Sequence, residues 1–372
     1  PASVPYWISP ASMRDEWYPQ DLATQSGPFI LRYIRGTTVY VYPFRYNAVE
    51  NVLRVYKNIT VELIENTTPV INPLPKEPTT VLREMDPVYR SVFINYDLSD
   101  DLTIGDYGDI LVICTDRDEE AMQPFMDWKR EKGFNVSAQS VATGTNVKTI
   151  IQDAYDVNNN LLYVQLVGDW DDVQSDLLEG YAPMDPQLGC VAGSDDHPDI
   201  CIGRFSANSA DEVSIQVDKV INYEKNPEAG ADWYSAALGV ASNQGPGDDN
   251  ELDYEQINVI YDDTLDPFNY ESFYTAYDPT GTAQLVTNAL NDGVSIINYC
   301  GHGSVTSWGS TGYNNNHIDG LTNENRLPVI FSVACVNGAF NSAGDCFAEA
   351  WLKKEDGGAV MTMMATINQP WN

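Results

Sequence analysis

Positive charge is scarce in this sequence. Its 372 residues include 20 Lys and Arg against 54 Asp and Glu, which gives a formal net charge of −34 at pH 7. A surface of this sign repels phosphate backbones and anionic lipids, so the composition argues against binding to nucleic acid or to a membrane surface. Hydrophobic residues make up 43% of the chain. That share is enough for a core, so we interpret the acidic excess as the solvated surface of a folded protein.

Long hydrophobic runs are also missing. The longest, such as 111–114 and 327–331, are far below the roughly 20 residues that cross a bilayer, so the sequence predicts no membrane span. The chain begins with Pro, and neither a basic nor an apolar leader follows. We therefore expect any export signal to have been removed or to lie outside this sequence.

Cysteine is sparse as well. Six cysteines in 372 residues are too few for a disulfide framework. Cys190 and Cys201 flank a turn-rich segment, and a single disulfide between these two is one possible pairing.

The first 75 residues or so alternate apolar and polar side chains over short stretches. Strands are predicted at 29–34, 38–42, 52–56 and 59–64, because period-two alternation between turn residues is typical of antiparallel sheets. Prolines then recur from Thr67 to Pro87, which predicts an extended linker. We therefore expect a β-rich module and linker over residues 1–88.

Beyond residue 107 apolar strands alternate with helices, which predicts an α/β fold with a parallel sheet covered on both faces. The expected subdomains are 89–230 and 231–372. Functional groups in such sheets gather at the carboxyl ends of strands. The expected strands are 109–114, 161–169, 236–242, 294–299 and 328–334, and the expected helices are 119–133, 210–226, 254–265, 283–291 and 346–354.

Two of these strand ends carry reactive side chains. One strand runs into Cys300-Gly-His302-Gly303, and another runs into Cys335-Val-Asn-Gly. A thiol needs a nearby base to become a thiolate at neutral pH, so His302 and Cys335 are candidates for a catalytic dyad. The N–H groups of Gly303 and Cys335 could stabilise an oxyanion. A structural role stays open for both side chains, because Cys is among the most buried residue types.

Three segments resemble the catalytic motifs of gingipain-type cysteine peptidases, with Lys-gingipain as the nearest member. They are 298–309 (NYCGHGSVTSWG), 327–340 (LPVIFSVACVNGAF) and 346–352 (CFAEAWL). The similarity extends over about 108–372, and residues 1 to about 88 resemble the end of the family's β-rich propeptide. The resemblance implies a caspase-like fold of two α/β subdomains, in agreement with the alternation of strands and helices.

The resemblance also implies roles for individual residues. By this resemblance, Cys335 is expected to be the nucleophile, and His302 is expected to act first as the general base and then as the general acid. An acidic residue is expected behind His302, in the loop 243–251. Asp249 is preferred over Asp248, while a solvated loop or a calcium ligand stays open as another interpretation of these carboxylates.

Two further residues are expected to contact substrate. Cys300 stands where the family lines the S1 pocket, in place of Thr in the relatives, and Trp308 belongs to the same motif. A basic P1 residue is the expected preference on the family resemblance.

No catalytic cofactor is expected, but structural calcium is. Asp195, Asp196, Asp199 and Asp248 lie on turns, and calcium takes six to eight oxygen ligands. The resemblance to a family that carries calcium supports this expectation.

Together these features predict a secreted or cell-surface cysteine endopeptidase that is made as a zymogen. Its expected partners are protein or peptide substrates, its own propeptide and a second chain from processing after Asn372, but no nucleic acid. Arg83 and Arg90 are candidate processing sites. The alternatives are a sortase-like transpeptidase of the same fold and an inactive, calcium-stabilised adhesion or binding module.

Overall fold

The computed structural model describes residues 10–64, 71–74, 80–97, 103–105, 107–246 and 250–369. The chain divides into two compact units. Unit 1 comprises residues 1–81, 85–104 and 192–199, and unit 2 comprises residues 82–84, 105–191 and 200–372.

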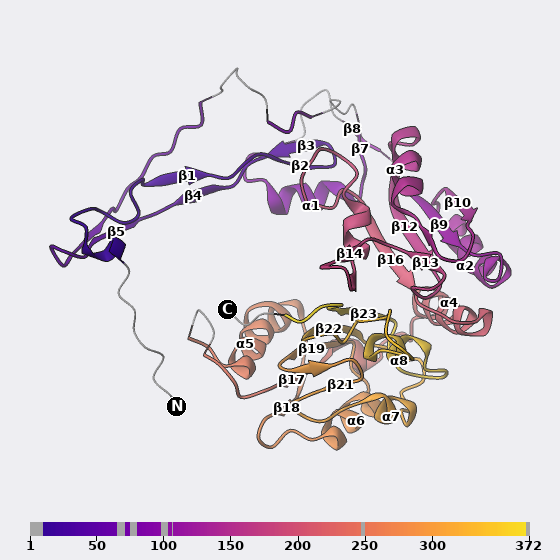
Figure 1. The fold of residues 1–372 in the computed structure, drawn as a ribbon. Coiled ribbons are helices and arrows are strands. Elements are labelled where there is room, and N and C mark those ends of the chain that lie inside the picture. The colour runs from indigo at the N-terminus through magenta and orange to yellow at the C-terminus, as the bar shows by residue number, and fades with distance from the viewer. Residues whose placement is uncertain are drawn as a thin grey trace. The chain divides into compact units, whose positions relative to one another are not determined.

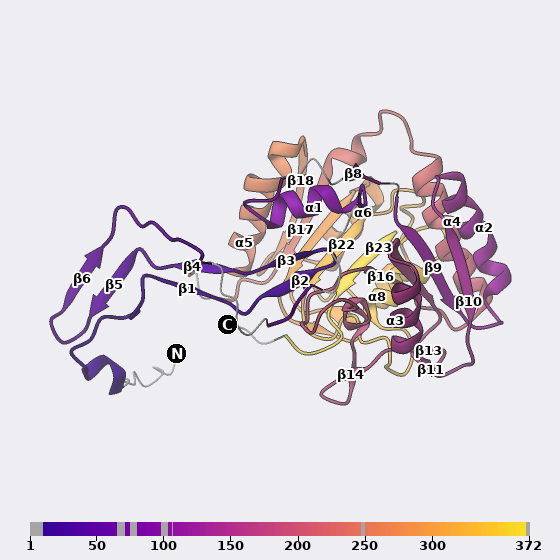
Figure 2. The ribbon, with the colours of Figure 1, turned by 90° about the horizontal axis from the view of Figure 1, so that it is seen from above.

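Unit 1 contains three antiparallel strand pairs, as the alternating pattern predicted. Figure 2 shows these pairs following one another along the unit. Its described elements are η1 (Pro10–Met13), β1 (Ala23–Gln25) paired with β4 (Val39–Val41), β2 (Phe29–Leu31) paired with β3 (Ile34–Gly36), β5 (Phe44–Asn47) paired with β6 (Val52–Val55), the parallel pair β7 (Thr80–Val81) and β8 (Thr103–Ile104), and α1 (Met85–Val92).

Three predictions for this part of the chain need correction or fall outside the described residues. The stretch 29–34 is a hairpin rather than one strand, because Arg32 turns the chain with a φ of 54°. Residues 59–64 form no strand. Much of the predicted linker lies outside the described residues. The C-terminal end of the predicted linker is helical. Pro87 stands in the first turn of α1, where the N–H that proline lacks would form no helical hydrogen bond.

The first part of unit 2 is a parallel sheet in the order β10-β9-β12-β16. Helices α2 and α4 pack on one face of it, where Met122 and Val217 join a core with Val112 and Phe205. The elements of this part are β9 (Asp109–Cys114), α2 (Glu119–Glu131), β10 (Val136–Ser140), β11 (Thr145–Asn146), α3 (Lys148–Val157), β12 (Leu161–Val167), β13 (Val173–Gln174), β14 (Leu177–Leu178), β15 (Ala182–Pro183), η2 (Asp185–Gly189), β16 (Cys201–Phe205) and α4 (Ala210–Lys225).

The second part of unit 2 is a parallel sheet in the order β18-β17-β19-β22-β23 (Figure 1). Val286, Ile318 and Trp351 from three helices share one core on one face, while on the other face α5 packs so closely that a Cβ on Gly239 would lie 2.7 Å from Ile257. The elements are η3 (Asp232–Ser235), β17 (Ala236–Ala241), α5 (Asp253–Ile260), η4 (Tyr261–Leu265), η5 (Asp266–Phe268), β18 (Ser272–Tyr277), α6 (Ala283–Asp292), β19 (Ile296–Cys300), β20 (Gly303–Ser304), β21 (Ser307–Trp308), α7 (Asn315–Asp319), β22 (Val329–Val333), α8 (Phe347–Lys353) and β23 (Met361–Met364).

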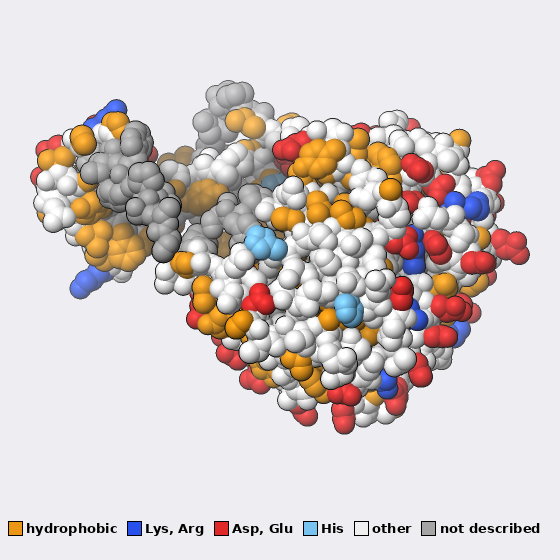
Figure 3. Space-filling view, turned by 60° about the horizontal axis from the view of Figure 1, so that its bottom comes forward, with side chains coloured by type: hydrophobic (Ala, Val, Ile, Leu, Met, Phe, Trp, Pro, Cys, Tyr) orange, Lys and Arg blue, Asp and Glu red, His pale blue; other side chains and the backbone are white. Residues whose placement is uncertain are grey.

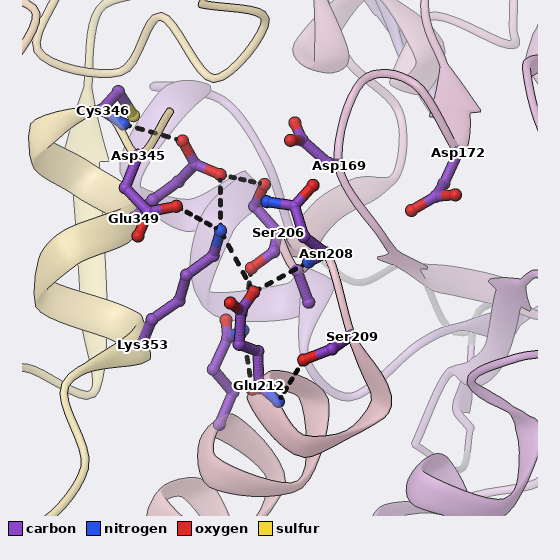
Figure 4. Close-up of polar contacts among 12 residues, drawn as sticks. Asp169, Asp172, Ser206, Asn208, Ser209, Glu212, Asp345, Cys346, Glu349 and Lys353 are labelled. Atoms are coloured by element: carbon purple, nitrogen blue, oxygen red, sulfur yellow. Dashed lines mark hydrogen bonds and ion pairs between the residues drawn. The ribbon is translucent and has the colours of Figure 1, made fainter. Parts of the chain in front are cut away.

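A buried charge cluster ties α8 of the second sheet to α4 of the first (Figure 4). The ammonium of Lys353, whose side chain is 5% exposed, lies 2.7 Å from Asp345, 3.1 Å from Glu349 and 3.3 Å from Glu212. Glu349 also accepts a hydrogen bond of 2.8 Å from Ser206, just after β16. Removing one charge from such a buried set leaves the others uncompensated, so the cluster strongly couples the two sheets of unit 2.

Two sequence expectations can be compared with the fold directly. All six cysteines are thiols, so the pairing of Cys190 with Cys201 is not formed. None of the described helices is long and apolar enough to cross a bilayer. On the face shown in Figure 3, acidic side chains are spread widely and basic ones are few, as the composition suggests.

Candidate active site

The two predicted reactive loops follow neighbouring strands. β19 and β22 are adjacent and parallel, and Cys300 stands opposite Val333. Both strands therefore end at the same edge of the sheet, and His302 and Cys335 come two residues later in each chain segment. The Gly301 N–H also donates to the Val333 carbonyl at 3.2 Å.

Gly303 is the point of closest approach between the two loops. A Cβ at this position would lie 2.7 Å from the Cys335 carbonyl oxygen and 2.9 Å from the Ala334 Cβ. The backbone after His302 therefore packs directly on the backbone of Cys335, and only glycine fits there. His302 is exposed and Cys335 is half-buried, so a substrate can reach both side chains from solvent.

Asn337 links the two loops through its side chain. This buried amide donates to the Ser304 carbonyl at 2.6 Å and to the Ser307 carbonyl at 3.1 Å. Its oxygen accepts from the Ser332 hydroxyl at 2.9 Å. Buried polar groups that are fully bonded hold a single arrangement, so Asn337 fixes the Cys335 loop relative to the His302 loop.

Tyr299 supports the other side of the His302 loop. Its hydroxyl donates to the His302 carbonyl at 2.6 Å and accepts from the Gly309 N–H at 3.1 Å. Burial raises the pKa of this phenol, so it stays protonated as a donor at neutral pH.

The chain bends sharply directly after Cys335. Val336 has a φ of 48°, a strained conformation for a β-branched residue that is found mostly at functional sites. It is held there by bonds from the Val336 N–H to the Ile367 carbonyl at 3.1 Å and from the Gly338 N–H to the Ala365 carbonyl at 2.8 Å. Among the described residues, no acceptor is bonded to the Cys335 N–H.

The imidazole of His302 contacts the side chain of Gln244. The Nε2 of His302 lies 2.8 Å from the Oε1 of Gln244. An amide oxygen only accepts, so Nε2 carries the proton and Nδ1 is the basic nitrogen of the neutral ring. The predicted residues Asp248 and Asp249 lie outside the described residues.

A carboxylate that the sequence analysis missed lies beside this histidine contact. Asp253 is 6% exposed. It accepts a very short hydrogen bond from the Ser242 hydroxyl, and its N–H donates to the Gln244 carbonyl at 3.0 Å. The Gln244 N–H in turn donates to the Ser242 oxygen at 3.2 Å. These three residues form a closed ring of hydrogen bonds that sets the position of Gln244.

Cys300 adjoins the same carboxylate. Burial, together with the charge of Asp253 and a hydrogen bond to it, raises the pKa of Cys300 to about 12. This thiol is therefore neutral at physiological pH, and it borders Asp253 rather than acting as a nucleophile. No described Lys, Arg or His forms an ion pair with Asp253. A buried carboxylate without a cationic partner favours a positively charged ligand.

Trp308 does not line the site. Its side chain is 0% exposed and stacks on Tyr299 with 4.7 Å between ring centroids. Its indole N–H donates to the Ser332 hydroxyl at 2.9 Å. Trp308 is therefore part of the core beneath the His302 loop, and its prediction as a substrate-binding residue was wrong because an aromatic side chain in a loop motif can equally point inward.

Of the predicted calcium ligands, Asp195, Asp196 and Asp199 belong to unit 1, and Asp248 lies outside the described residues. The carboxylates of Asp195 and Asp199 accept backbone N–H groups from Ile30, Arg32 and Ala192. Within the described residues no three His, Cys, Asp or Glu side chains gather as a metal site, and calcium at Asp195, Asp196, Asp199 and Asp248 stays a prediction.

The structure therefore adds four residues to the candidate site: Gln244, Asp253, Asn337 and Tyr299. Asn337 stands in the Cys335 motif, and its amide close to a candidate nucleophile was a signal in the sequence that could have identified it. Nothing in the order of residues singled out Gln244 or Asp253 among the many polar side chains of their loop.

A cysteine and a histidine at neighbouring strand ends of a parallel sheet are the arrangement that cysteine-based nucleophilic catalysis on an α/β fold requires. Residues 105–371 match the model of peptidase family C25, and residues 1–101 match that of the C25 propeptide. The first match covers more than half of the chain, so the chain belongs to peptidase family C25.

Its relatives include the gingipains of Porphyromonas gingivalis. Gingipain R2 is 35% identical over 386 residues, which cover 100% of this chain and 52% of that protein. Lys-gingipain is 24% identical over 394 residues, which cover 100% of this chain and 22% of that protein. The identity is thus higher to gingipain R2 than to the expected nearest member, and this chain spans about half or less of the length of these relatives.

Two solved structures share the fold. The complex of RgpB pro- and mature domains from Porphyromonas gingivalis has a TM-score of 0.67 and 35% identity, and the match covers 71% of this chain and 65% of that chain. The Arg-specific cysteine proteinase gingipain R has a TM-score of 0.67 and 34% identity, and the match covers 71% of this chain and 64% of that chain.

Proposed function

We propose that this chain is a cysteine endopeptidase in which Cys335 is the nucleophile and His302 is the general base. The observation that carries the proposal is the contact of Gly303 with the backbone of Cys335, because it joins the two loops at one strand edge. Membership of peptidase family C25 supports the same chemistry.

The proposed reaction uses groups of this chain alone. His302 takes the thiol proton, and the thiolate attacks the carbonyl carbon of the scissile bond. The Gly303 and Cys335 N–H groups stabilise the negative oxygen. The C–N bond then breaks, His302 returns the proton to the leaving amine, and water hydrolyses the thioester to restore the thiol.

Gln244 is proposed to hold His302 in the productive orientation. Its amide accepts from Nε2, which leaves Nδ1 as the nitrogen that exchanges a proton with the thiol. The ring with Ser242 and Asp253 holds Gln244 itself at both its N–H and its carbonyl. This is the role that a third residue plays in other nucleophile–histidine systems.

We propose a basic P1 residue as the preferred substrate. Asp253 supplies a buried carboxylate beside Cys300 with no described cationic partner, and a guanidinium or ammonium group would satisfy it. The relative of known structure is described as Arg-specific. The N-terminal module, which matches the C25 propeptide, is proposed to make the chain a zymogen, and secretion is proposed on the family resemblance.

The experiment is cleavage of fluorogenic peptides by the full chain, before and after an incubation that allows self-processing. We expect the activity to be lost in Cys335→Ala and His302→Ala and kept in Cys201→Ser, a matched change of an exposed thiol. Iodoacetamide should label Cys335 first. Cleavage that persists in Cys335→Ala would contradict the proposal, and transfer of the acyl group to an added amine in preference to water would indicate a transpeptidase.

The P1 preference has its own test. Asp253→Asn should lower kcat/KM for Arg or Lys at P1 by about 10²-fold or more. For a neutral P1 the loss should be far smaller, because the Asn side-chain oxygen can still accept from Ser242 and keep Gln244 in place. Asp263→Asn is the control, since Asp263 is exposed in η4, the helical segment that follows α5. Equal losses of kcat/KM for basic and neutral substrates would show that Asp253 does not bind the P1 side chain.

A further inference from the structure

The β14–β15 hairpin projects from unit 2 and carries apolar side chains at its tip (Figure 2). Leu177, Leu178 and Tyr181 are 37%, 41% and 47% exposed. Single exposed apolar side chains are common, but a group of them on a projecting hairpin forms a patch of the kind that contacts a ligand. The hairpin therefore presents a small apolar surface that the proposed reaction does not use.

The turn at the tip of the hairpin has a tightly defined geometry. The Tyr181 N–H donates to the Leu178 carbonyl at 3.1 Å, and the two residues between them, Glu179 and Gly180, have φ values of 53° and 80°. Positive φ at both central positions is typical of the tightest hairpin turns. Such a φ is uncommon for a glutamate, and backbone strain of this kind is found mostly at functional sites.

The base of the hairpin is fixed to the first sheet of unit 2. The Ser175 hydroxyl donates to the Asp185 carboxylate at 2.8 Å. Arg204 of β16 donates to the same carboxylate twice, at 2.7 Å and 3.0 Å. The side chain of Arg204 is only 7% exposed, and a two-bond pair of this kind fixes the geometry of both partners. The tip is therefore held at one place relative to the sheet.

Two hydrogen bonds join the hairpin to the segments that follow Cys335 and β23. The side-chain amide of Asn341 donates to the Tyr181 carbonyl at 2.7 Å. The Thr366 hydroxyl donates to the Pro183 carbonyl at 2.9 Å. Both bonds use main-chain oxygens of the hairpin, so the side chains at its tip are not consumed by these contacts.

The segment that contains Thr366 also runs past the candidate nucleophile. The Val336 N–H donates to the Ile367 carbonyl at 3.1 Å, and the Cys335 Sγ lies 3.7 Å from the Gln369 carbonyl oxygen. The short stretch 366–369 thus connects the hairpin to Cys335. Because an extended peptide advances about 3.3 Å per residue, a substrate that reacts at Cys335 reaches the hairpin within roughly three or four residues of the scissile bond.

We propose that the tip of the β14–β15 hairpin binds an apolar side chain of the peptide substrate, a few residues from the scissile bond. This inference rests on the proposed function, because it assigns the hairpin to the same substrate that reacts at Cys335. Leu178 and Tyr181 cover the apolar side chain, and its removal from water favours binding. Substrate choice then depends on two features, a basic P1 residue and an apolar residue on one flank.

The test uses internally quenched peptides with Arg at P1 and either Leu or Ser at one position at a time, from P4 to P2 and from P2′ to P4′. We expect the wild-type chain, after the incubation that allows self-processing, to favour Leu over Ser in kcat/KM by about 10-fold at one or more of these positions. In Leu178→Ser combined with Tyr181→Ser, the ratio should fall below about 2-fold. Both substitutions keep the main-chain carbonyls that Asn341 and Thr366 use.

Leu285→Ser is the matched control. Leu285 is a similarly exposed leucine, at 45%, on α6, so the Leu-over-Ser ratio should stay at its wild-type value. Thermal unfolding checks that each variant is folded, and Leu178→Ser alone replaces the double variant if the latter is not. Equal kcat/KM for every Leu and Ser pair in wild type overturns the proposal, as does a Leu preference that survives in the folded hairpin variant.

A binding measurement separates this proposal from the proposed chemistry. Fluorescence anisotropy with the Cys335→Ala chain measures the Kd of the same peptides without cleavage. A Kd that is about 10-fold lower for a Leu peptide than for its Ser counterpart, with the difference lost on substitution of the hairpin, supports the site even if wild type cleaves no peptide. Cleavage of both peptides with equal constants overturns the hairpin site alone, and the absence of both cleavage and binding overturns both proposals.

Discussion

At the residue scale, one described partner of the His302 imidazole is a neutral amide. Gln244 accepts from Nε2 of His302, and the carboxylates expected from the family resemblance, Asp248 and Asp249, lie outside the described residues. An amide fixes the ring as well as a carboxylate does, but it adds no negative charge to stabilise the imidazolium. Among the described residues, further titratable groups near this region are the Cys335 thiol, the Tyr299 phenol that donates to the His302 carbonyl and the Asp253 carboxylate that accepts from Ser242.

Replacing this amide should change the pH profile. In Gln244→Glu, the added negative charge favours the protonated ring, which cannot take the thiol proton, so the acid limb of kcat/KM should move up by about 0.5–1 pH unit. Gln244→Ala should lower kcat by about 10- to 100-fold with little change in KM. Profiles measured for both variants and wild type check this, and identical limbs in Gln244→Glu would exclude contact between the two side chains during catalysis.

At the element scale, the site depends on how closely two strand ends approach. Gly303→Ala places a methyl group 2.7 Å from the Cys335 carbonyl oxygen, so the loops must separate. A displacement of this kind costs roughly 10²-fold in rate. We expect that loss in kcat/KM with a folded protein, measured by peptide cleavage and thermal unfolding.

Gly320→Ala is the matched control for this change. A Cβ there would meet its nearest neighbour, the His317 carbonyl, at an ordinary 3.6 Å. Equal activity in the two alanine variants would show that the contact at Gly303 does not position the reactive side chains.

A second prediction at this scale concerns Asp169, which follows the end of β12. Burial raises the pKa of Asp169 to about 6, and the nearby Glu349 adds to the shift. The folded state therefore binds this proton more tightly than the unfolded state. The ionised carboxylate costs stability above about pH 6, and the cost fades as the pH falls through 6 toward 4.

Asp169→Asn should remove this cost. We expect it to raise the free energy of unfolding by about 1–2 kcal/mol at pH 8 and by much less at pH 4. Urea unfolding at both pH values measures the difference. Asp171→Asn, at an exposed position nearby, should change neither value, and a gain for Asp169→Asn that is independent of pH would contradict the assignment.

At the scale of the whole molecule, the net charge of −34 creates a field that attracts cationic peptides. For two substrates with the same P1 residue, one with three flanking lysines and one with neutral flanks, we expect salt to act differently. Raising the salt from about 20 to about 300 mM should lower kcat/KM several-fold for the cationic substrate, because screening shortens the range of the field. Equal salt dependence of kcat/KM for the two substrates would show that the net charge does not steer cationic peptides to the protein.

Much of unit 2 was predictable because local pattern and tertiary role agree there. The apolar stretch 109–114 is a buried strand, and Ser209 begins α4 as its N-cap by accepting from Glu212. Agreement was poorer in unit 1, where Arg32 reverses the chain inside an apparently continuous strand. A left-handed turn at an arginine leaves no mark in hydrophobic periodicity.

The sequence by itself determined the class of fold, the acidic surface and the two candidate reactive residues, His302 and Cys335. These follow from hydrophobic periodicity, composition and motifs that are local in the chain. Only the tertiary structure decided which side chains surround them. Gln244 and Asp253 reach the site, Trp308 turns into the core, and residues 192–199 join the N-terminal module. Such contacts join residues far apart in the chain, and their geometry is set by strand register and packing, which no local pattern contains.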